Sequence, residues 1–250
     1  MEISLSAETL FHIWSFPVTN TLIVTVCVSC FLIIASVIVK KKLALIPKGL
    51  QNLLEFVIEA VLDLVDSVTQ DREQSEKFFP LIATIFLFVI MSNWVELIPG
   101  LGTIGINEYS NGHAVFIPFI RSASADLNVT LALAVISVIS VQVMGIAALG
   151  FFKYAGKFIV NPFHKPYVVG TFVGILELIG EVAKLISFSF RLFGNIFAGE
   201  VLLAVMLMLV PYFVPLPFLA LEIFVGFIQA LVFAMLTLVF LKMAVTETVH

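Results

Sequence analysis

The chain alternates long uncharged apolar runs with short polar segments. The first run, residues 20–39, matches the roughly 20 residues that an α-helix needs to cross a bilayer. Further apolar runs occupy residues 78–100, 128–152, about 167–209 and 216–245. The last two exceed an ordinary crossing by many residues, so their helices must tilt steeply or lie partly in the membrane plane. We therefore predict about five membrane helices, the last two of them long and strongly tilted.

Residues 48–70 follow a different pattern, in which polar side chains recur every three or four positions and share one helical stripe. The stripe consists of Asn52, Glu55, Glu59, Asp63 and Asp66. Four acids in one span argue against a crossing helix that faces lipid. We predict an amphipathic helix at the membrane surface or packed against neighbouring spans, although the acids alone would also suit a solvated helix face. Residues 71–77, DREQSEK, are expected to form a polar hinge, and residues 101–125 a loop.

Composition supports a membrane protein throughout. Hydrophobic residues make up 61% of the 250 residues and charged residues 12%, whereas a soluble domain carries about 25% charged residues. Mean hydropathy is +1.14. No internal repeat or domain boundary is evident, so we expect one all-α membrane domain over residues 1–250. Cys27 and Cys30 lie in the first apolar run without ligand-type neighbours, which indicates a buried apolar pair and no redox or metal chemistry.

Basic residues test the topology, because the cytoplasmic loops of membrane proteins are enriched in Lys and Arg. If the first run crosses from outside to inside, the cytoplasmic side receives Lys40, Lys41, Lys42, Lys48, Arg72, Lys77, Lys153, Lys157, Lys165 and Lys242. Only Arg121 then lies on the outer side of the membrane. This asymmetry predicts an N-terminus outside and a C-terminus in the cytoplasm. It leaves Lys184 and Arg191 within the apolar runs.

A polar stripe follows the run at residues 167–209. Its members, separated by 4, 3, 7 and 4 residues, are Glu177, Glu181, Lys184, Arg191 and Asn195. These spacings keep them on one helical face. A charge at the centre of a membrane costs about 2.5–3.5 kcal/mol even on insertion scales, so this face does not meet lipid. In the last run Glu222 and Gln229 share a face, while Glu200 lies about half a turn round from Arg191.

The two basic residues within the apolar runs differ in what they need. Glu181 and Lys184 can form a salt bridge near the inner interface, with the lysine reaching toward the headgroups. The acids nearest to Arg191 on its own face are at least ten residues away, and an arginine side chain keeps its positive charge in proteins. Arg191 therefore needs a carboxylate from elsewhere, which a partner subunit can supply.

Several stretches resemble one family in order and spacing across nearly the whole chain. RLFGNIFAGE at residues 191–200 and FIQALVFAMLTLVFLKMA at residues 227–244 resemble subunit a of the F-type ATP synthases, the stator half of a rotary ion channel. SADLNVTLALA at residues 124–134 and ELIPG at residues 96–100 resemble other signature stretches of this family.

The resemblance implies two offset half-channels for ions, which we expect to be protons, against a rotating ring of subunit c. Arg191 would face the carboxylate of the ring and keep the half-channels from joining. The outer half-channel would be lined by Asn195, Glu200, Glu222, Gln229, Asp126 and Asn128. The inner half-channel would be lined by Glu177, Glu181 and Lys184. Gly194 and Gly199 would admit close approach of another helix, from the ring or from the chain itself.

Glu222 stands where some family members have histidine, so the outer half-channel would hold two glutamates. We expect burial and mutual repulsion to let Glu200 and Glu222 share a proton near neutral pH. Relay schemes that depend on a histidine therefore do not transfer to this chain.

The resemblance also implies partners and a setting. The partners would be the c-ring, the peripheral-stalk subunit b, the remaining synthase subunits and the lipid bilayer, and the setting a bacterial inner membrane. The chain would carry protons, or sodium if the ring selects it, without catalysing ATP chemistry. We expect no metal, cofactor or nucleic acid. A secondary transporter is the alternative, but it would show an internal repeat and broken helices. A purely structural scaffold would have no need of the costly intramembrane charges.

Overall fold

The structure is a computed structural model that describes residues 6–41, 49–110, 113–158, 167–210 and 212–246. Five of its helices are long and apolar enough to cross a membrane. They are α1 (Asn20–Lys41), α3 (Arg72–Val95), α4 (Leu127–Leu149), α6 (Tyr167–Leu209) and α7 (Pro215–Val245). The prediction of an all-α membrane protein with about five membrane helices is confirmed.

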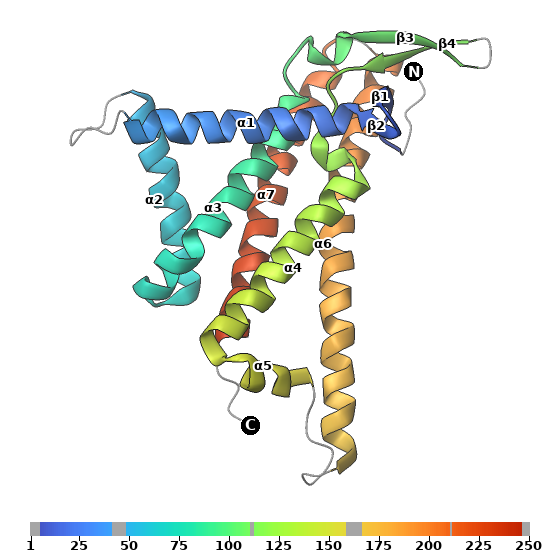
Figure 1. Ribbon diagram of the computed structural model, residues 1–250. Coiled ribbons are helices and arrows are strands. Elements are labelled where there is room, and N and C mark those ends of the chain that lie inside the picture. Colours follow the sequence, from blue (N-terminus) through green and yellow to red (C-terminus); the bar gives the residue numbers. More distant parts are fainter. Residues whose placement is uncertain (1–5, 42–48, 111–112, 159–166, 211, 247–250) are drawn as a thin grey trace.

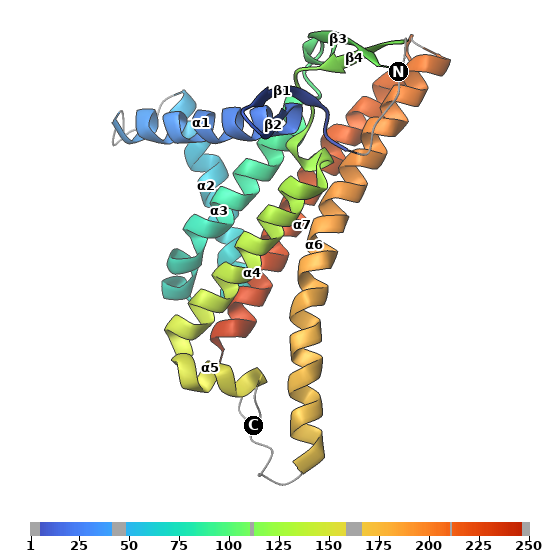
Figure 2. The ribbon, with the colours of Figure 1, turned by 45° about the vertical axis from the view of Figure 1, so that its right-hand side comes forward.

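The two C-terminal helices run side by side in opposite directions, while α1 lies crosswise over the C-terminal end of α3 and the N-terminal end of α4 (Figures 1 and 2). At 1.5 Å per residue the 43 residues of α6 extend about 65 Å, more than twice a hydrocarbon core of about 30 Å. The 22 residues of α1 extend about 33 Å, which fits one upright crossing. If α1 stands along the bilayer normal, α6 and α7 are steeply tilted.

The predicted amphipathic helix is α2 (Leu50–Thr69). Its apolar residues divide into two groups. Val61 and Val65 are buried in the main core, whereas Leu53 and Phe56 are 60% and 70% exposed. A helix that buries one apolar edge in protein and exposes another suits the membrane interface. In Figure 1 α2 begins beside the C-terminal end of α1 and turns away from it.

The expected hinge at residues 71–77 is wrong, because this segment forms the first turns of α3. Asp71 has an extended backbone, and its carboxylate accepts the N–H of Glu73 at 3.0 Å, which caps the helix. Gln70 ends α2 in the left-handed conformation. Arg72 then pairs with Asp66 of α2 and, at 3.2 Å, with Glu76. The polar residues therefore make a tight helix–helix corner.

Short elements that the sequence pattern did not predict gather at one end of the molecule (Figures 1 and 2). The strands are β1 (Thr9–Ile13), β2 (Phe16–Thr19), β3 (Gly105–Ser110) and β4 (His113–Pro118), in two antiparallel hairpins. The other short elements are the 3-10 helices η1 (Leu101–Thr103) and η2 (Ala123–Ala125) and the helix α5 (Phe151–Phe158). All except α5 lie near the end where α6 stops and α7 starts, called here the hairpin end.

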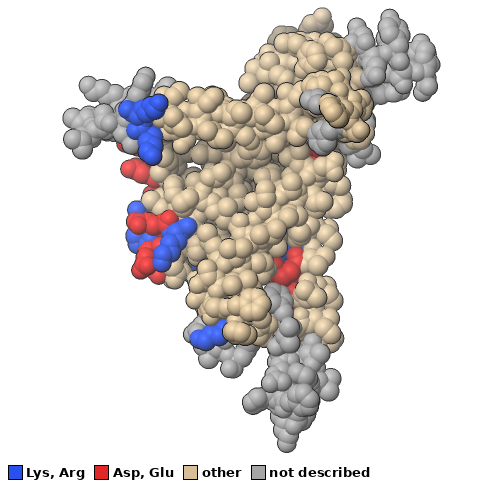
Figure 3. Space-filling view, in the orientation of Figure 1, with Lys and Arg blue, Asp and Glu red and all other residues tan. Residues whose placement is uncertain are grey.

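The main core lies where α3, α4, α6 and α7 meet. Phe188 of α6 contacts Phe233 and Phe240 of α7, with ring centroids 5.0 and 5.5 Å apart. Much apolar surface stays exposed elsewhere, as a lipid-facing protein requires. Cys27 and Cys30 are free and exposed on α1, so the expectation that they are buried is wrong. Figure 3 shows a mainly uncharged face, with many of its charged groups gathered around α2 and the start of α3.

The packing of α5 against α4 gives a testable prediction. A methyl group at Gly145 of α4 would lie 2.4 Å from Cε2 of the buried Tyr154, whose hydroxyl donates to Gln142 at 2.5 Å. We expect Gly145→Ala to lower the free energy of unfolding by about 1–3 kcal/mol through overpacking, measured by thermal unfolding in detergent. Gly180 of α6 has open space around it, so Gly180→Ala should be neutral or stabilising. Equal stabilities of the two variants would contradict this packing.

Candidate functional site

Arg191 lies near the middle of α6 on a face that the rest of the chain leaves open. Its neighbours Phe188 and Leu192 are buried toward the core, whereas Arg191 is exposed. The guanidinium donates to Ser187 Oγ at 3.1 Å, one turn earlier in α6. Among the residues that the structure describes, no carboxylate lies within ion-pair distance of Arg191. A permanent cation is therefore presented outward from an apolar helix.

The surface beside Arg191 is made of small residues. Ser187, Gly194, Asn195 and Ala198 lie around it at helical spacing, and a methyl group at Gly194 would meet nothing within 4 Å. We call Arg191 and these four residues the open face of α6. Asn195, predicted to share the stripe with Arg191, is exposed on the same face. The open face can therefore accept another helix at short distance.

Gly199 contacts the chain's own α7. A methyl group at Gly199 would lie 1.8 Å from Oε2 of Glu222, so the glycine makes room for this buried carboxylate. Of the two origins left open for the partner of Gly199, the structure favours the chain itself. Glu222 also lies close enough to Glu200 for the charges of the two carboxylates to interact.

Glu200 has a cation of its own. Arg121, 3% exposed, lies just before η2, and its Nε is 2.9 Å from Glu200 Oε1. A second guanidinium nitrogen donates to Glu200 Oε2 at 3.0 Å, and a third donates to the carbonyl of Ser6 at 3.3 Å. The guanidinium also lies 6.0 Å from the ring centroid of Phe197. The predicted outer residue Glu200 thus belongs to a buried ion pair.

Two further carboxylates join this group. Glu96, directly after α3, accepts the N–H of Ser122 at 2.8 Å, and its charge interacts with Glu200, Arg121 and Glu222. Burial, followed by the charge of Glu200, raises the pKa of Glu96. Glu8, before β1, interacts with Arg121 and Glu200, and burial raises its pKa as well. We call Glu8, Glu96, Arg121, Glu200 and Glu222 the carboxylate cluster.

Asp126 and Asn128, which the resemblance placed on the outer path, meet each other at the start of α4. The Asp126 carboxylate caps α4 by accepting the Asn128 N–H at 2.8 Å and its side-chain amide at 3.1 Å. Thr21 of α1 donates to the same carboxylate at 2.8 Å. Asp126 thus has a clear structural role in joining α1 to α4. Gln229, two helical turns from Glu222 on α7, is half-buried.

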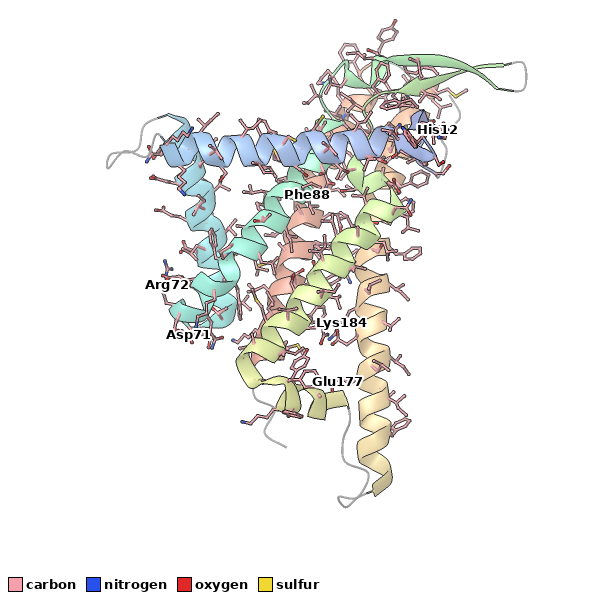
Figure 4. All side chains as sticks on the ribbon, viewed as in Figure 1. His12, Asp71, Arg72, Phe88, Glu177 and Lys184 are labelled. Atoms are coloured by element: carbon pink, nitrogen blue, oxygen red, sulfur yellow. The ribbon has the colours of Figure 1, made fainter. Side chains whose placement is uncertain are left out.

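The residues predicted for the inner path lie on α6 beside α4 and α5, as Figure 4 shows for Glu177 and Lys184. Lys184 pairs with Glu181 at 2.6 Å, and its ammonium lies 4.6 Å from the ring centroid of Phe240. The predicted contact of Glu181 with Lys184 is therefore present. Burial and the charges of Glu181 and Glu177 raise the pKa of Tyr154 to about 12, which shows that this phenol lies near both acids.

Sequence reasoning missed part of the carboxylate cluster. Arg121 carried a signal, because it was the basic residue left outside by the charge asymmetry. Glu96 stood in the quoted stretch ELIPG, but a carboxylate at a helix end is commonly solvated. Glu8 carried no signal, since only the N-terminal hairpin brings it to Arg121. Within the described part of the chain no group of three His, Cys, Asp or Glu side chains is arranged to hold a metal ion.

Comparison with known proteins identifies the family. The family model described as ATP synthase A chain matches residues 18–242. A protein of Campylobacter concisus called ATP synthase subunit a is 35% identical over 224 residues, which cover 89% of this chain and 88% of the relative.

Two further relatives are the ATP synthase subunit a of Geobacter sulfurreducens and that of Moorella thermoacetica. The first is 34% identical over 92% of this chain and 87% of its own length, and the second is 29% identical over 93% of each. The family-model match covers the open face of α6 and all of the carboxylate cluster except Glu8. The chain belongs to the ATP synthase A chain family, subunit a of the F-type ATP synthases.

Proposed function

We propose that α6 and α7 of this stator subunit pass protons through two offset half-channels against a rotating ring of subunit c. The chain is a non-catalytic membrane subunit, so its work is ion transfer and not ATP chemistry. One observation carries the proposal: Arg191 is exposed on the open face, and the described chain gives it no carboxylate. Family membership also argues against the alternative of a secondary transporter.

Arg191 acts through its fixed charge. A cation favours the ionised form of an acid within about 4–6 Å and so lowers the pKa of that acid. A ring carboxylate that reaches Arg191 therefore gives up its proton there and takes a new one only after it has passed. The same cation repels a bare proton moving straight between the half-channels. Each unit charge that crosses releases about 2.3 kcal/mol per 100 mV, which drives rotation.

The two paths are proposed from the two polar regions of α6. On the outer side Glu200, Glu222, Asn195 and Gln229 lie toward the hairpin end, with Asp126 and Asn128 at the start of α4. On the inner side Glu177, Glu181 and Lys184 lie on the opposite half of α6. The separation of the two regions along one helix, with Arg191 between them, is the arrangement that two offset half-channels need.

The orientation of the subunit in the membrane is proposed from the lysines that lie at the two ends of α2. Lys40 and Lys41 end α1 near the start of α2, and Lys242 of α7 donates to the carbonyl of Val68 at the other end of α2. A cytoplasmic position of these lysines follows the positive-inside rule and places the hairpin end outside. The expected setting is a bacterial inner membrane. There the ring, the peripheral-stalk subunit b and the other synthase subunits are the expected partners.

The charge of Arg191 can be tested directly. We expect Arg191→Ala to abolish ATP-driven proton uptake by inverted membrane vesicles that contain the complete synthase, because ring carboxylates would no longer be held ionised at the crossing point. The same variant should abolish coupled ATP synthesis while the complex still assembles. Arg72→Ala is the control, since Arg72 is exposed at the α2–α3 corner and should leave pumping intact. Normal pumping by Arg191→Ala would refute the proposed role.

The two glycines should respond differently. Gly194→Leu is expected to leave thermal unfolding of the isolated subunit within about 1 kcal/mol, because Gly194 lies on the open face and a methyl group there would meet nothing within 4 Å, yet to stop pumping by blocking the ring. Gly199→Ala should displace the Glu222 carboxylate, which is the end of a flexible side chain, so it should destabilise the isolated subunit by no more than about 1 kcal/mol and slow proton uptake without stopping it. A Gly194→Leu complex that pumps at the normal rate would show that the ring does not approach this face.

A further inference from the structure

Arg121 stands out because it is a buried cation that ties several segments together. It is 3% exposed, and its nitrogens contact both oxygens of Glu200 from α6 and the carbonyl of Ser6 from the N-terminal segment. Its guanidinium cannot deprotonate at physiological pH. The arginine is therefore a fixed positive charge at the hairpin end of the molecule.

The geometry has a direct consequence for Glu200. Two guanidinium nitrogens lie 2.9 to 3.2 Å from its carboxylate oxygens, which is the forked contact that binds a carboxylate most strongly. Protonating Glu200 would remove the charge that strengthens these hydrogen bonds and would break part of the forked contact. A carboxylate held in this way is a poor carrier for a proton that must move on. Within the pair of Glu200 and Glu222, this geometry therefore favours Glu222 as the carrier of the shared proton.

Glu222 is in the opposite situation. It is buried, its carboxylate packs against Gly199, and it has no ion-pair partner in the described parts of the chain. Arg121 interacts with the charges of Glu8 from the N-terminal segment, Glu96 from the end of α3 and Glu200 from α6, whereas Glu222 from α7 interacts with Glu200 and Glu96. No cation that the structure describes pairs with the buried Glu222, so this acid is buried at least cost when it carries a proton.

Unpaired polar atoms lie close to Glu96. Ser92 and Ser124 bury their hydroxyl oxygens with no hydrogen-bond partner among the described residues, and they flank Ser122, whose N–H donates to Glu96 and whose hydroxyl donates to the Ser92 carbonyl. Buried polar atoms of this kind are commonly satisfied by water. Water at these hydroxyls would bring protons to Glu96, whose charge interacts with that of Glu222, on a side other than the Arg121–Glu200 contact.

We propose that Arg121 is a positioning residue of the outer path, which holds Glu200 as a permanently paired carboxylate and leaves Glu222 as the group that exchanges the proton. The proton moves from outside water to Glu222 and from there to the ring carboxylate. Glu200 fixes the path's shape and charge without being protonated. This inference rests on the proposed function, because it assigns roles within the outer half-channel.

A series of variants that remove single charges from the complete synthase tests the inference. Arg121→Gln should slow ATP-driven proton uptake at least about tenfold, because it leaves Glu200 buried without its cation. Glu200→Gln, which removes the carboxylate that Arg121 contacts, should also slow uptake without abolishing it, and the double variant, which removes both charges, should be faster than Arg121→Gln. Glu222→Gln should abolish uptake, alone or combined with Arg121→Gln. Arg121→Lys, which keeps the charge, should restore part of the rate.

The pH profile separates a positioning role from a packing defect. In Arg121→Gln the freed Glu200 becomes able to titrate, so uptake should gain a pH-dependent step that is absent from the double variant. Arg72→Gln is the matched control, because it breaks an exposed ion pair and should change neither rate nor profile.

The inference is overturned if the assembled double variant is as slow as Arg121→Gln, or if Glu200→Gln abolishes uptake as Glu222→Gln does. If either result is obtained and Arg191→Ala is inactive, the inference about Arg121 fails but the proposed function is still supported. An active Arg191→Ala would instead remove the proposed function itself.

Discussion

A permanently charged guanidinium in apolar surroundings is the constraint on which the rest of the structure depends. Arginine cannot shed its charge, and an unpaired charge in a membrane costs several kcal/mol. The chain meets this constraint in two ways. Arg121 is buried and paired within the chain to Glu200, whereas Arg191 is left exposed on α6 beside small residues. One arginine completes the subunit, and the other requires a partner with a carboxylate.

The remaining fold serves to hold Arg191 and the Arg121–Glu200 pair at different positions along α6. α6 has 43 residues and carries an inner pair of acids, a central arginine and an outer acid. A helix of this length fits within the membrane only if it is steeply tilted from the bilayer normal. Apolar contacts then have to fix its rotation, since a turn of α6 would carry Arg191 into lipid or core. Phe188 and Leu192, on either side of the arginine in sequence, provide this lock by packing toward α7 and the core.

The sequence was sufficient for the features that depend on periodicity. The apolar runs gave the bounds of α1, α6 and α7 within a few residues, and the stripe at residues 48–70 gave α2. The α2–α3 corner was missed because Asp71 looks like any loop residue until its carboxylate is seen to cap α3. The hairpins were missed because strands of four to six residues are too short for a clear alternation.

The site shows the same division between helical spacing and tertiary contact. The separation of Arg191 and Asn195 was enough to place them on one face. The separation of Glu181 and Lys184 was likewise enough to predict their contact. No spacing could link Arg121 to Glu200, which are 79 positions apart, or bring Glu8 to either. Glu8 and Ser6 lie before residue 18, where the family match begins. Part of the charge balance around Glu200 is therefore built by a segment outside the matched region. The electrostatics of the outer path can thus differ between relatives that share the same α6 and α7.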